Sequence, residues 1–423
     1  MKAPNSNPIP MKRPLLDLDV AVDAVIRTAV EMRESRPVST RAMGLWEASG
    51  YIVAEDVRAD RDAPGFDKSM MDGFAIRTAD LTGEVTDFVV TGEIAAGGVP
   101  SRALAPGEAM AIMTGAPIPD GADAVAIVEV CERQGETVRV RARPRPGENI
   151  TRRGTQARVG DVVVEAGRVI ENLTAGVLGS VGAASVKVFR RPRVSVYATG
   201  DELVNIEDTP GPAQIRDSNR RTLISLLEGE WGRVVDGGIV RDERAELRRA
   251  ILEGLESDVL VLSGGVSAGT YDLVRECLEA EGVEILFHQI AIKPGKPVLF
   301  GRTDRCLIFG LPGNPVSSFV TATMLVAPAL RILGRRPEHR TWMLDLPIVG
   351  ELPAAERRTT IHPGELVRGA GSEVSVRALG WDGSADHIGY ARANVLIRRN
   401  PGSPAARPGD RVCVVLPRGL AAW

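Results

Sequence analysis

The chain contains few aromatic residues, which make up 4% of its 423 residues. Stacking on the bases of single-stranded nucleic acid therefore has few candidate side chains. Charge of one sign is not in excess either, because 52 lysines and arginines stand against 55 acidic residues, a net charge of −3. Proteins that bind nucleic acid usually carry a basic face. The composition argues against nucleic acid as a partner.

Closely spaced cysteines are also absent. The four cysteines form no CxxC pair, which argues against a zinc site and against a disulfide framework. The four histidines are equally scattered, and none is predicted to ligate a metal. The sequence also contains no Ser-His-Asp set, nucleophile elbow, Walker A lysine motif or GxGxxG fingerprint.

Long hydrophobic runs are missing as well. Residues 1–13 are polar and proline-rich, so they do not resemble a signal peptide. The longest apolar segment, 319–333, is interrupted by Thr321, Thr323 and Pro328 and is shorter than the roughly 20 residues of a membrane-spanning helix. We therefore expect a cytoplasmic protein.

The chain has ample material for several cores, with 44% hydrophobic residues, 45 glycines and 28 prolines. Its length predicts three or four domains. The fold class predicted is multidomain α/β, with a doubly wound, mostly parallel α/β domain. The predicted domains are a discontinuous N-terminal linker domain (14–57 plus 151–190), a β-rich insertion domain (58–150), the α/β domain (191–335) and a C-terminal small β-barrel domain (336–423), for which a sandwich is the alternative.

Helical spacing of apolar residues predicts helices over 17–35 and 41–48 in the first segment. The α/β segment alternates strands with predicted helices at 219–230, 243–256, 273–281 and 316–333. No helix is predicted after residue 337, where strands are expected at 342–349, 373–378, 394–397 and 411–416.

Four Gly/Pro-rich loops each follow a short apolar strand in the middle of the chain. Such strands are typical of a parallel sheet buried on both faces, and ligands bind at the carboxyl ends of its strands. Glycine allows backbone N–H groups to approach a ligand, and lysine adds charge. We expect an oxyanion site at these loops, which span 198–202, 263–269, 293–297 and 311–315.

Two features sharpen that prediction. Lys293 and Lys296 flank a Pro-Gly turn, so both ammonium groups can address one small anion. Pro315 follows Asn314 at a predicted helix start, where free N–H groups favour an anion.

Carboxylates accompany the same loops, and acids beside a phosphate site commonly hold Mg²⁺. Asp217 and Asp242 each have a helix cap as the alternative role, and so has Asp272, whose place at the end of a glycine loop favours metal. The five acids are Asp201, Glu202, Asp217, Asp242 and Asp272.

In the β-rich insertion, Asp72-Gly73 is either functional or a hairpin turn, and Met70-Met71 is either part of the core or part of a wall that contacts the ligand.

Taken in order, these motifs resemble the molybdopterin molybdenumtransferase family, which includes the bacterial MoeA proteins and the gephyrin E domain. The resemblance covers nearly the whole chain. It is carried by residues 69–73, 113–116, 152–154, 199–202, 217–219, 263–267, 293–297 and 311–315.

The resemblance implies a homodimer that inserts molybdate into adenylylated molybdopterin, with Mg²⁺, and releases molybdenum cofactor and AMP. Other proteins of cofactor biosynthesis are possible partners. It implies that Asp242, Asp272 and Glu202 serve the metal, and that the catalytic set is Asp72, Thr114, Glu202, Asp242, Asp272 and Lys293. The implied substrate-binding residues are Ser263, Gly264, Gly265, Ser267, Lys293, Lys296, Pro297, Pro312, Gly313, Asn314, Pro315 and Ser384.

The sequence departs from the family at two places. Thr155-Gln156 stands where the family usually has Glu-Asp, and Glu365 stands where the family has an arginine that helps to hold molybdate. Arg368 is a candidate substitute for that arginine. Two alternatives to the transferase follow: an ATP-using enzyme that adenylylates molybdopterin, and a catalytically weakened paralogue that acts as a molybdopterin-binding scaffold or regulator.

Overall fold

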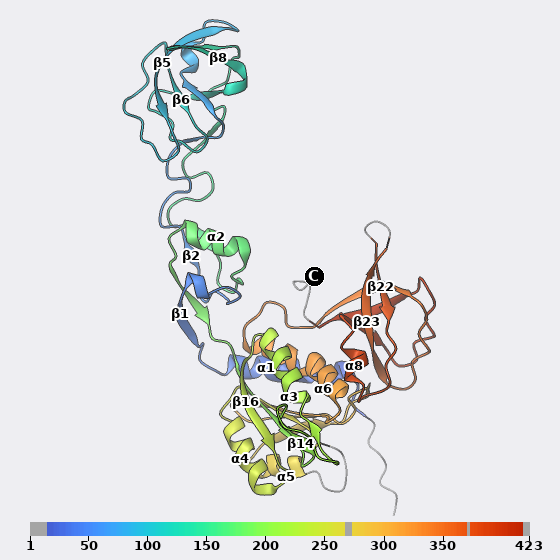
Figure 1. The fold of residues 1–423 in the computed structure, drawn as a ribbon. Coiled ribbons are helices and arrows are strands. Elements are labelled where there is room, and N and C mark those ends of the chain that lie inside the picture. The colour runs from blue at the N-terminus through green and yellow to red at the C-terminus, as the bar shows by residue number, and fades with distance from the viewer. Residues whose placement is uncertain (1–14, 267–272, 370–372, 418–423) are drawn as a thin grey trace, which may run out of the picture. The chain divides into compact units, whose positions relative to one another are not determined.

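The computed structural model describes residues 15–266, 273–369 and 373–417. The chain divides into two compact units, one running from Arg41 to Val188 and a larger one formed by the segments on either side (Figure 1). Each unit is described by itself below.

The larger unit contains a six-stranded sheet of the doubly wound type. Its strands are ordered β16-β13-β17-β21-β20-β18. The first four pair in parallel, and β20 pairs antiparallel with both β21 and β18. The central strands are apolar runs buried on both faces, which is why a parallel sheet is predictable from them. The predicted fold is confirmed. The strands span Arg233–Val240 (β16), Arg193–Thr199 (β13), Val259–Ser263 (β17), Leu307–Leu311 (β21), Leu299–Arg302 (β20) and Glu284–His288 (β18).

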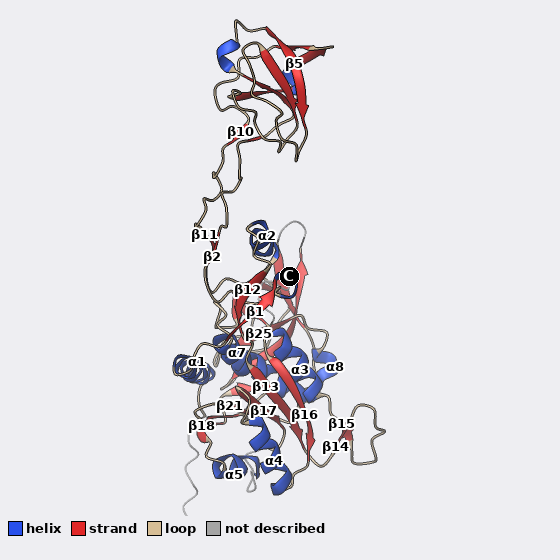
Figure 2. Ribbon diagram, turned by 90° about the vertical axis from the view of Figure 1, so that its left-hand side faces the viewer, coloured by secondary structure: helices blue, strands red, loops and turns tan. Residues whose placement is uncertain are grey.

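Helices cover both faces of this sheet (Figure 2). One core contains α1 (Leu18–Glu34), α3 (Asn219–Gly229), and α6 (Pro315–Thr321), which continues through a π-helical turn (Ala322–Val326) into α7 (Ala327–Leu333). The other core contains α4 (Arg244–Gly254) and α5 (Leu273–Ala280). The helices predicted at 17–35, 219–230, 243–256, 273–281 and 316–333 are confirmed.

The place of α1 differs from the predicted domain layout, and the longest apolar segment is buried. Helix α1 packs against α7, so it lies in the larger unit rather than with residues 151–190. The segment Pro315–Leu333 is long and apolar enough to cross a membrane, but 89% of its most apolar stretch is buried inside the protein. Its apolar character serves the core.

The C-terminal strands of the larger unit close into a barrel, as predicted. The ring runs β23-β24-β22-β26-β25 and closes through the pairing of β25 with β23. The strands span Trp342–Val349 (β22), Thr359–Arg368 (β23), Val374–Ala378 (β24), Val395–Arg399 (β25) and Arg411–Leu416 (β26). The expectation that no helix follows residue 337 is wrong, because Asp386 caps a short helix, α8 (His387–Tyr390), by accepting a hydrogen bond from the Gly389 amide at 2.8 Å.

The smaller unit is mostly β-structure. Its main sheet has the order β7-β4-β6-β5-β9-β8, formed by Gly73–Ile76 (β4), Thr86–Ile94 (β5), Glu108–Ile112 (β6), Ala124–Ile127 (β7), Cys131–Gln134 (β8) and Thr137–Val140 (β9). Three two-stranded pairs accompany it: β1 (Thr40–Gly44) with β12 (Ser185–Phe189), β2 (Val57–Arg58) with β11 (Val162–Val164), and β3 (Lys68–Ser69) with β10 (Ile150–Thr151). Helix α2 spans Asn172–Ser180.

The helix predicted over 41–48 is wrong. Residues Thr40–Gly44 form β1, which pairs with β12, and only Leu45–Glu47 form a single 3₁₀ turn. The Leu45 amide donates to the Ala184 carbonyl at 3.0 Å. Pairing with a segment about 140 residues away overrides the local helical pattern.

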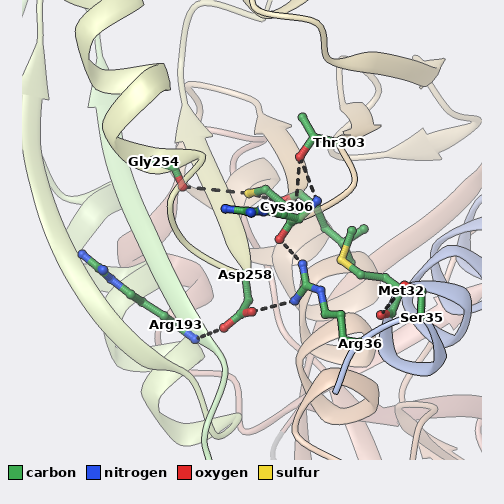
Figure 3. A network of polar contacts seen from close by, with 10 residues as sticks. Met32, Ser35, Arg36, Arg193, Gly254, Asp258, Thr303 and Cys306 are labelled. Carbon is green, nitrogen blue, oxygen red and sulfur yellow. Dashed lines mark hydrogen bonds and ion pairs between the residues drawn. The ribbon is translucent and has the colours of Figure 1, made fainter. Parts of the chain in front are cut away.

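A polar network fastens α1 to the edge of the α/β sheet where β13 and β17 begin (Figure 3). Arg36 Nη1 donates to Asp258 Oδ1 at 2.7 Å, and Asp258 Oδ2 accepts from the Arg193 amide at 2.8 Å. Arg36 also donates to the Arg305 carbonyl, next to the buried Cys306. These contacts lie at the end of the sheet where β13 and β17 begin, and the loops after β17 and β21 leave the sheet from its opposite, carboxyl end.

Candidate functional site

The loops after β17 and β21 are tied together at the carboxyl edge of the α/β sheet. The Gly264 amide donates to the Leu311 carbonyl at 3.0 Å. Asn219, the first residue of α3, donates through Nδ2 to Ser263 Oγ at 3.0 Å and to the Gly313 carbonyl at 2.7 Å. The structure therefore brings three predicted substrate-binding residues together. Asn219 is the connection that sequence reasoning missed, although the signal, the triplet 217–219, was visible.

The Ser-Gly-Gly loop is packed so closely that only glycine fits. Gly264 and Gly265 have φ angles of +103° and +66°. A Cβ atom on Gly264 would lie 2.3 Å from the Thr199 carbonyl oxygen, and one on Gly265 would lie 2.6 Å from Val274 Cγ2. Both glycines therefore let the backbone pack at a distance at which any side chain would clash. Ser267 and Asp272, predicted for the same loop, lie outside the described residues.

The start of α6 lies beside the C-terminal part of the chain. Pro315 is the first residue of α6 and Asn314 is its N-cap. Asn314 Nδ2 donates to Ser384 Oγ at 2.9 Å, and the Val316 amide donates to the Ser384 carbonyl at 3.2 Å. Ser384, predicted from a distant segment, is therefore in direct contact with the α/β domain.

The strand directly before the loop with Lys293 and Lys296 does not belong to the α/β sheet, contrary to the prediction. Strand β19 (Ile292–Lys293) pairs in parallel with β23 of the C-terminal sheet, where Lys293 lies opposite Thr360. The flanking strands β18 and β20 pair antiparallel with each other, so this loop is their connection. The loop packs against α6, because a Cβ atom on Gly295 would lie 2.5 Å from Thr321 Cγ2, in the last residue of that helix. Lys293 is exposed, and Lys296 and Pro297 are half-buried.

Carboxylates gather after β13 and β16. The Asp242 amide donates to Asp201 Oδ1 at 3.2 Å. Burial raises the pKa of Asp242, and the neighbouring carboxylates of Asp201 and Glu202 raise it further. Such mutual repulsion favours a cation between the acids.

The two proposed helix caps differ. Asp217 is buried, accepts from the Arg220 amide at 3.1 Å and forms an ion pair with the Arg220 side chain at 2.9 Å, so it caps α3. The N-cap of α4 is Glu243, which forms no side-chain cap, and in the described ranges no α4 amide donates to the Asp242 carboxylate. Asp242 therefore remains available for a ligand.

The carboxylates of Asp201, Glu202 and Asp242 fit a magnesium ion. Magnesium usually binds one or two protein carboxylates and completes its coordination shell with water and substrate phosphates. Over residues 15–266, 273–369 and 373–417, no three His, Cys, Asp or Glu side chains are placed to hold a metal by themselves. Phosphate oxygens would therefore have to contribute.

In the smaller unit, Asp72 and Thr114 form a polar pair. Asp72 Oδ1 accepts from the Thr114 amide at 2.6 Å and from Thr114 Oγ1 at 2.8 Å. These two bonds lower the pKa of Asp72, so its carboxylate is held ionised. The pair is exposed, and so are Met70 and Met71, at 54% and 42%. The methionines are therefore not core residues. Asp72-Gly73 is not a hairpin turn, because β3 and β4 pair with other strands.

Glu365 has a partner of its own. Its Oε2 lies 3.0 Å from Nη1 of Arg377, the residue opposite it on β24. Arg368 is the last residue of β23, three positions beyond Glu365. An odd spacing along a strand places the two side chains on opposite faces, so Arg368 does not project from the face of position 365.

Comparisons with known proteins agree with these motifs. Residues 16–182 match the MoeA N-terminal region (domain I and II), and residues 195–332 match the probable molybdopterin binding domain. A molybdopterin molybdenumtransferase of Haemophilus influenzae is 36% identical over 85% of this chain and 90% of its own. One from Staphylococcus aureus is 32% identical over 98% and 97%.

Solved structures are similar as well. A molybdopterin biosynthesis MoeA protein from Pyrococcus horikoshii superimposes with a TM-score of 0.75 at 30% identity, over 93% of this chain and 99% of its own. A second structure, also of a molybdopterin biosynthesis MoeA protein from Pyrococcus horikoshii, gives a TM-score of 0.79 at 25% identity, over 95% of this chain and 100% of its own. The likeness extends over both units of the chain. The chain therefore belongs to the molybdopterin molybdenumtransferase family.

Proposed function

We propose that this chain inserts molybdate into adenylylated molybdopterin and releases molybdenum cofactor and AMP. The observation that carries the proposal is the match to molybdopterin molybdenumtransferases along almost the whole chain, 98% of it in one relative. A stand-alone adenylylating enzyme would need only the α/β domain, whereas the match here includes residues 16–182.

In this proposal the Gly-rich loops hold the phosphates of the pterin substrate. Gly264 and Gly265 let the backbone approach the ligand, and Asn219 keeps the loops after β17 and β21 in register. In the same proposal Asp242 would face the cation, supported by the nearby negative charges of Glu202 and Asp201. Bound Mg²⁺ would neutralise charge on the phosphates.

The molybdate side of the site is assigned to the loop over α6. Lys293, Lys296 and Pro297 lie on that loop, and Ser384 is held against the start of α6 by Asn314. Ammonium groups attract the dianion, and the Ser384 hydroxyl adds a donor. In this proposal the protein positions two anions, molybdate and the phosphorylated pterin, and excludes competing water.

We also propose a cytoplasmic homodimer in which the Asp72–Thr114 pair completes the site of the second copy. Support comes from the pair itself, which is exposed, ionised and flanked by exposed Met70 and Met71. Exposed apolar side chains beside a fixed carboxylate are typical of a surface that meets a partner or a ligand.

The test is an in vitro synthesis. The protein is incubated with adenylylated molybdopterin, Mg²⁺ and molybdate, and AMP and active cofactor are measured against a reaction without molybdate. Molybdate-dependent AMP release supports the transferase. Binding of the pterin with no AMP release supports the scaffold, and pyrophosphate release from ATP with molybdopterin supports the adenylylating enzyme.

A further inference from the structure

Strand β16 contains one extra residue shortly before the candidate cation site. Val196 of β13 lies opposite Asp236 of β16. The next pair joins Tyr197 to Gly238, so Gly237 has no partner on β13. A single unpaired residue of this kind is a β-bulge, which bends a strand and changes the direction of the side chains that follow it. The bulge therefore decides how the end of β16 presents its residues.

The bulge brings Asp242 level with Asp201. After the bulge, Thr199 lies opposite Val240. The same register, continued two residues past the strand ends, sets Asp201 opposite Asp242, and the Asp242 amide donates to Asp201 Oδ1 at 3.2 Å. Without the extra residue, Arg241 would take that position, because a slip of one residue exchanges the two faces of a strand. The position of the carboxylate proposed to face the cation therefore depends on the bulge.

Arg220 of α3 holds the bulge from the neighbouring helix. Its Nη1 donates to Asp236 Oδ1 at 2.8 Å, and the same oxygen accepts from the Gly238 amide at 3.0 Å. Gly238 has a φ of +84°, which favours glycine. A Cβ atom on Gly237 would lie 2.3 Å from Cε1 of Tyr197, so this position also requires glycine. The bulge thus depends on two glycines and on one guanidinium that is bound from outside the strand.

The same guanidinium also holds the start of α3. Arg220 Nε lies 2.9 Å from Asp217 Oδ2, and the Asp217 carboxylate caps α3 by accepting from the Arg220 amide. Asn219, the first residue of α3, ties the loops after β17 and β21 together. The side chains of Arg220 and Asp217 are 15% and 1% exposed, whereas that of Asp236 is 54% exposed. A largely buried guanidinium therefore contacts one acid on each half of the site.

We propose that Arg220 is a positioning residue that joins the two halves of the site. Through Asp236 it fixes the bulge and therefore the position of Asp242. Through Asp217 it fixes the first turn of α3 and therefore Asn219. Arginine suits this role because its planar guanidinium holds several acceptors in a fixed geometry, which the point charge of a lysine does not. The proposal rests on the function proposed above, which assigns Asp242 to the cation and the two loops to the pterin phosphates.

The experiment uses variants that separate the two contacts of the guanidinium. Asp236→Asn weakens the contact with the bulge, and Asp217→Asn weakens the contact with α3 while asparagine still caps the helix. Arg220→Gln weakens both contacts. Arg221→Gln, at the next and exposed position of α3, is the matched control. Arg220→Lys asks whether charge alone restores the function.

Hydrogen exchange followed by mass spectrometry measures the bulge directly, on full-length protein without metal or substrate. We expect the amides of residues 233–242 to exchange at least about fivefold faster in Arg220→Gln and Asp236→Asn than in wild type, because the bulge loses its outside partner. In Arg221→Gln they should exchange as in wild type. Equal exchange in Arg220→Gln and Arg221→Gln would overturn the proposal.

Turnover then distinguishes positioning from a general loss of stability. Asp236→Asn should raise the half-saturating Mg²⁺ concentration about tenfold and leave the KM for adenylylated molybdopterin within about twofold of wild type. Asp217→Asn should have the reverse effect. Arg220→Gln should raise both values, and Arg220→Lys should not restore them to wild type. If the two aspartate variants changed both values equally, or if Arg220→Gln changed neither, the proposal would be wrong.

Two further points keep the test decisive. If Arg220→Gln does not fold, Asp236→Asn carries the test of the bulge, because its side chain is half exposed. Failure of the proposed function is distinguishable, since it would abolish molybdate-dependent AMP release in wild type, while hydrogen exchange over residues 233–242 still reports whether Arg220 holds the bulge.

Discussion

Replacing Gly264 by alanine tests whether the Ser-Gly-Gly loop must lie close to Thr199. The new Cβ atom would sit 2.3 Å from the Thr199 carbonyl oxygen, so the loop or the strand end must move by roughly 1 Å. A 1 Å displacement in a site can reduce the rate about a hundredfold. We expect kcat/KM for adenylylated molybdopterin to fall between about tenfold and a hundredfold.

The matched control is Gly282→Ala. Gly282 also has a positive φ, +80°, but its added Cβ would meet no atom within 4 Å. Both changes place alanine in the left-handed region, which costs about 1–2 kcal/mol. Gly282→Ala should therefore lower the free energy of unfolding by that amount and leave kcat/KM within about twofold of wild type.

Steady-state kinetics and urea unfolding of the two variants separate these effects. If Gly264→Ala had the same kinetics as Gly282→Ala, close packing of the loop would not matter for the substrate, and the phosphate-binding role of this loop would be refuted.

Three further predictions concern metal, assembly and stability. Asp242→Asn should lower turnover about a hundred- to thousandfold. The pKa of Asp242 is raised in the folded state, so the charged carboxylate destabilises the wild-type protein as pH rises. In thermal unfolding, Asp242→Asn should therefore be more stable than wild type at pH 7 and equal to it below about pH 4. Mixing Asp72→Ala with Asp242→Ala subunits should restore activity absent from either alone, and no recovery after verified subunit exchange would exclude a shared site. Glu230→Gln should cost about 3–5 kcal/mol in urea unfolding, because it breaks a buried pair with Arg331 at 2.6 Å; a loss below about 1 kcal/mol would contradict this.

The parallel sheet could be predicted because its strands carry their own signal. A strand such as Val259–Ser263 is buried along its full length, so its sequence is apolar up to its last residue, and a Gly-rich loop follows it. The Lys293 loop also follows a short apolar run, but that run is not a strand of the parallel sheet. Ile290 bridges to Leu16, and Ile292 pairs with Thr359, so its apolar residues face partners far away in the sequence.

Residue types in the site were predictable, and their contacts were not. The sequence identifies Asp242 and Asp217 as similar acids before helices, but only the structure separates a helix cap from a free carboxylate. The contact between Asn314 and Ser384 gives no sequence signal, because it joins residues 70 positions apart. Side-chain environment of this kind arises from tertiary packing, which local pattern does not encode.

The most direct test of the central claim is the stoichiometry of one reaction. Purified wild-type protein is given adenylylated molybdopterin, Mg²⁺ and molybdate, AMP is quantified, and the cofactor formed is measured by reconstitution of an apo-molybdoenzyme. We predict that one AMP is released for each active cofactor formed. When molybdate is omitted, AMP and cofactor should both form more slowly than in the complete reaction. AMP release at the same rate without molybdate, or no active cofactor despite AMP release, would contradict the account.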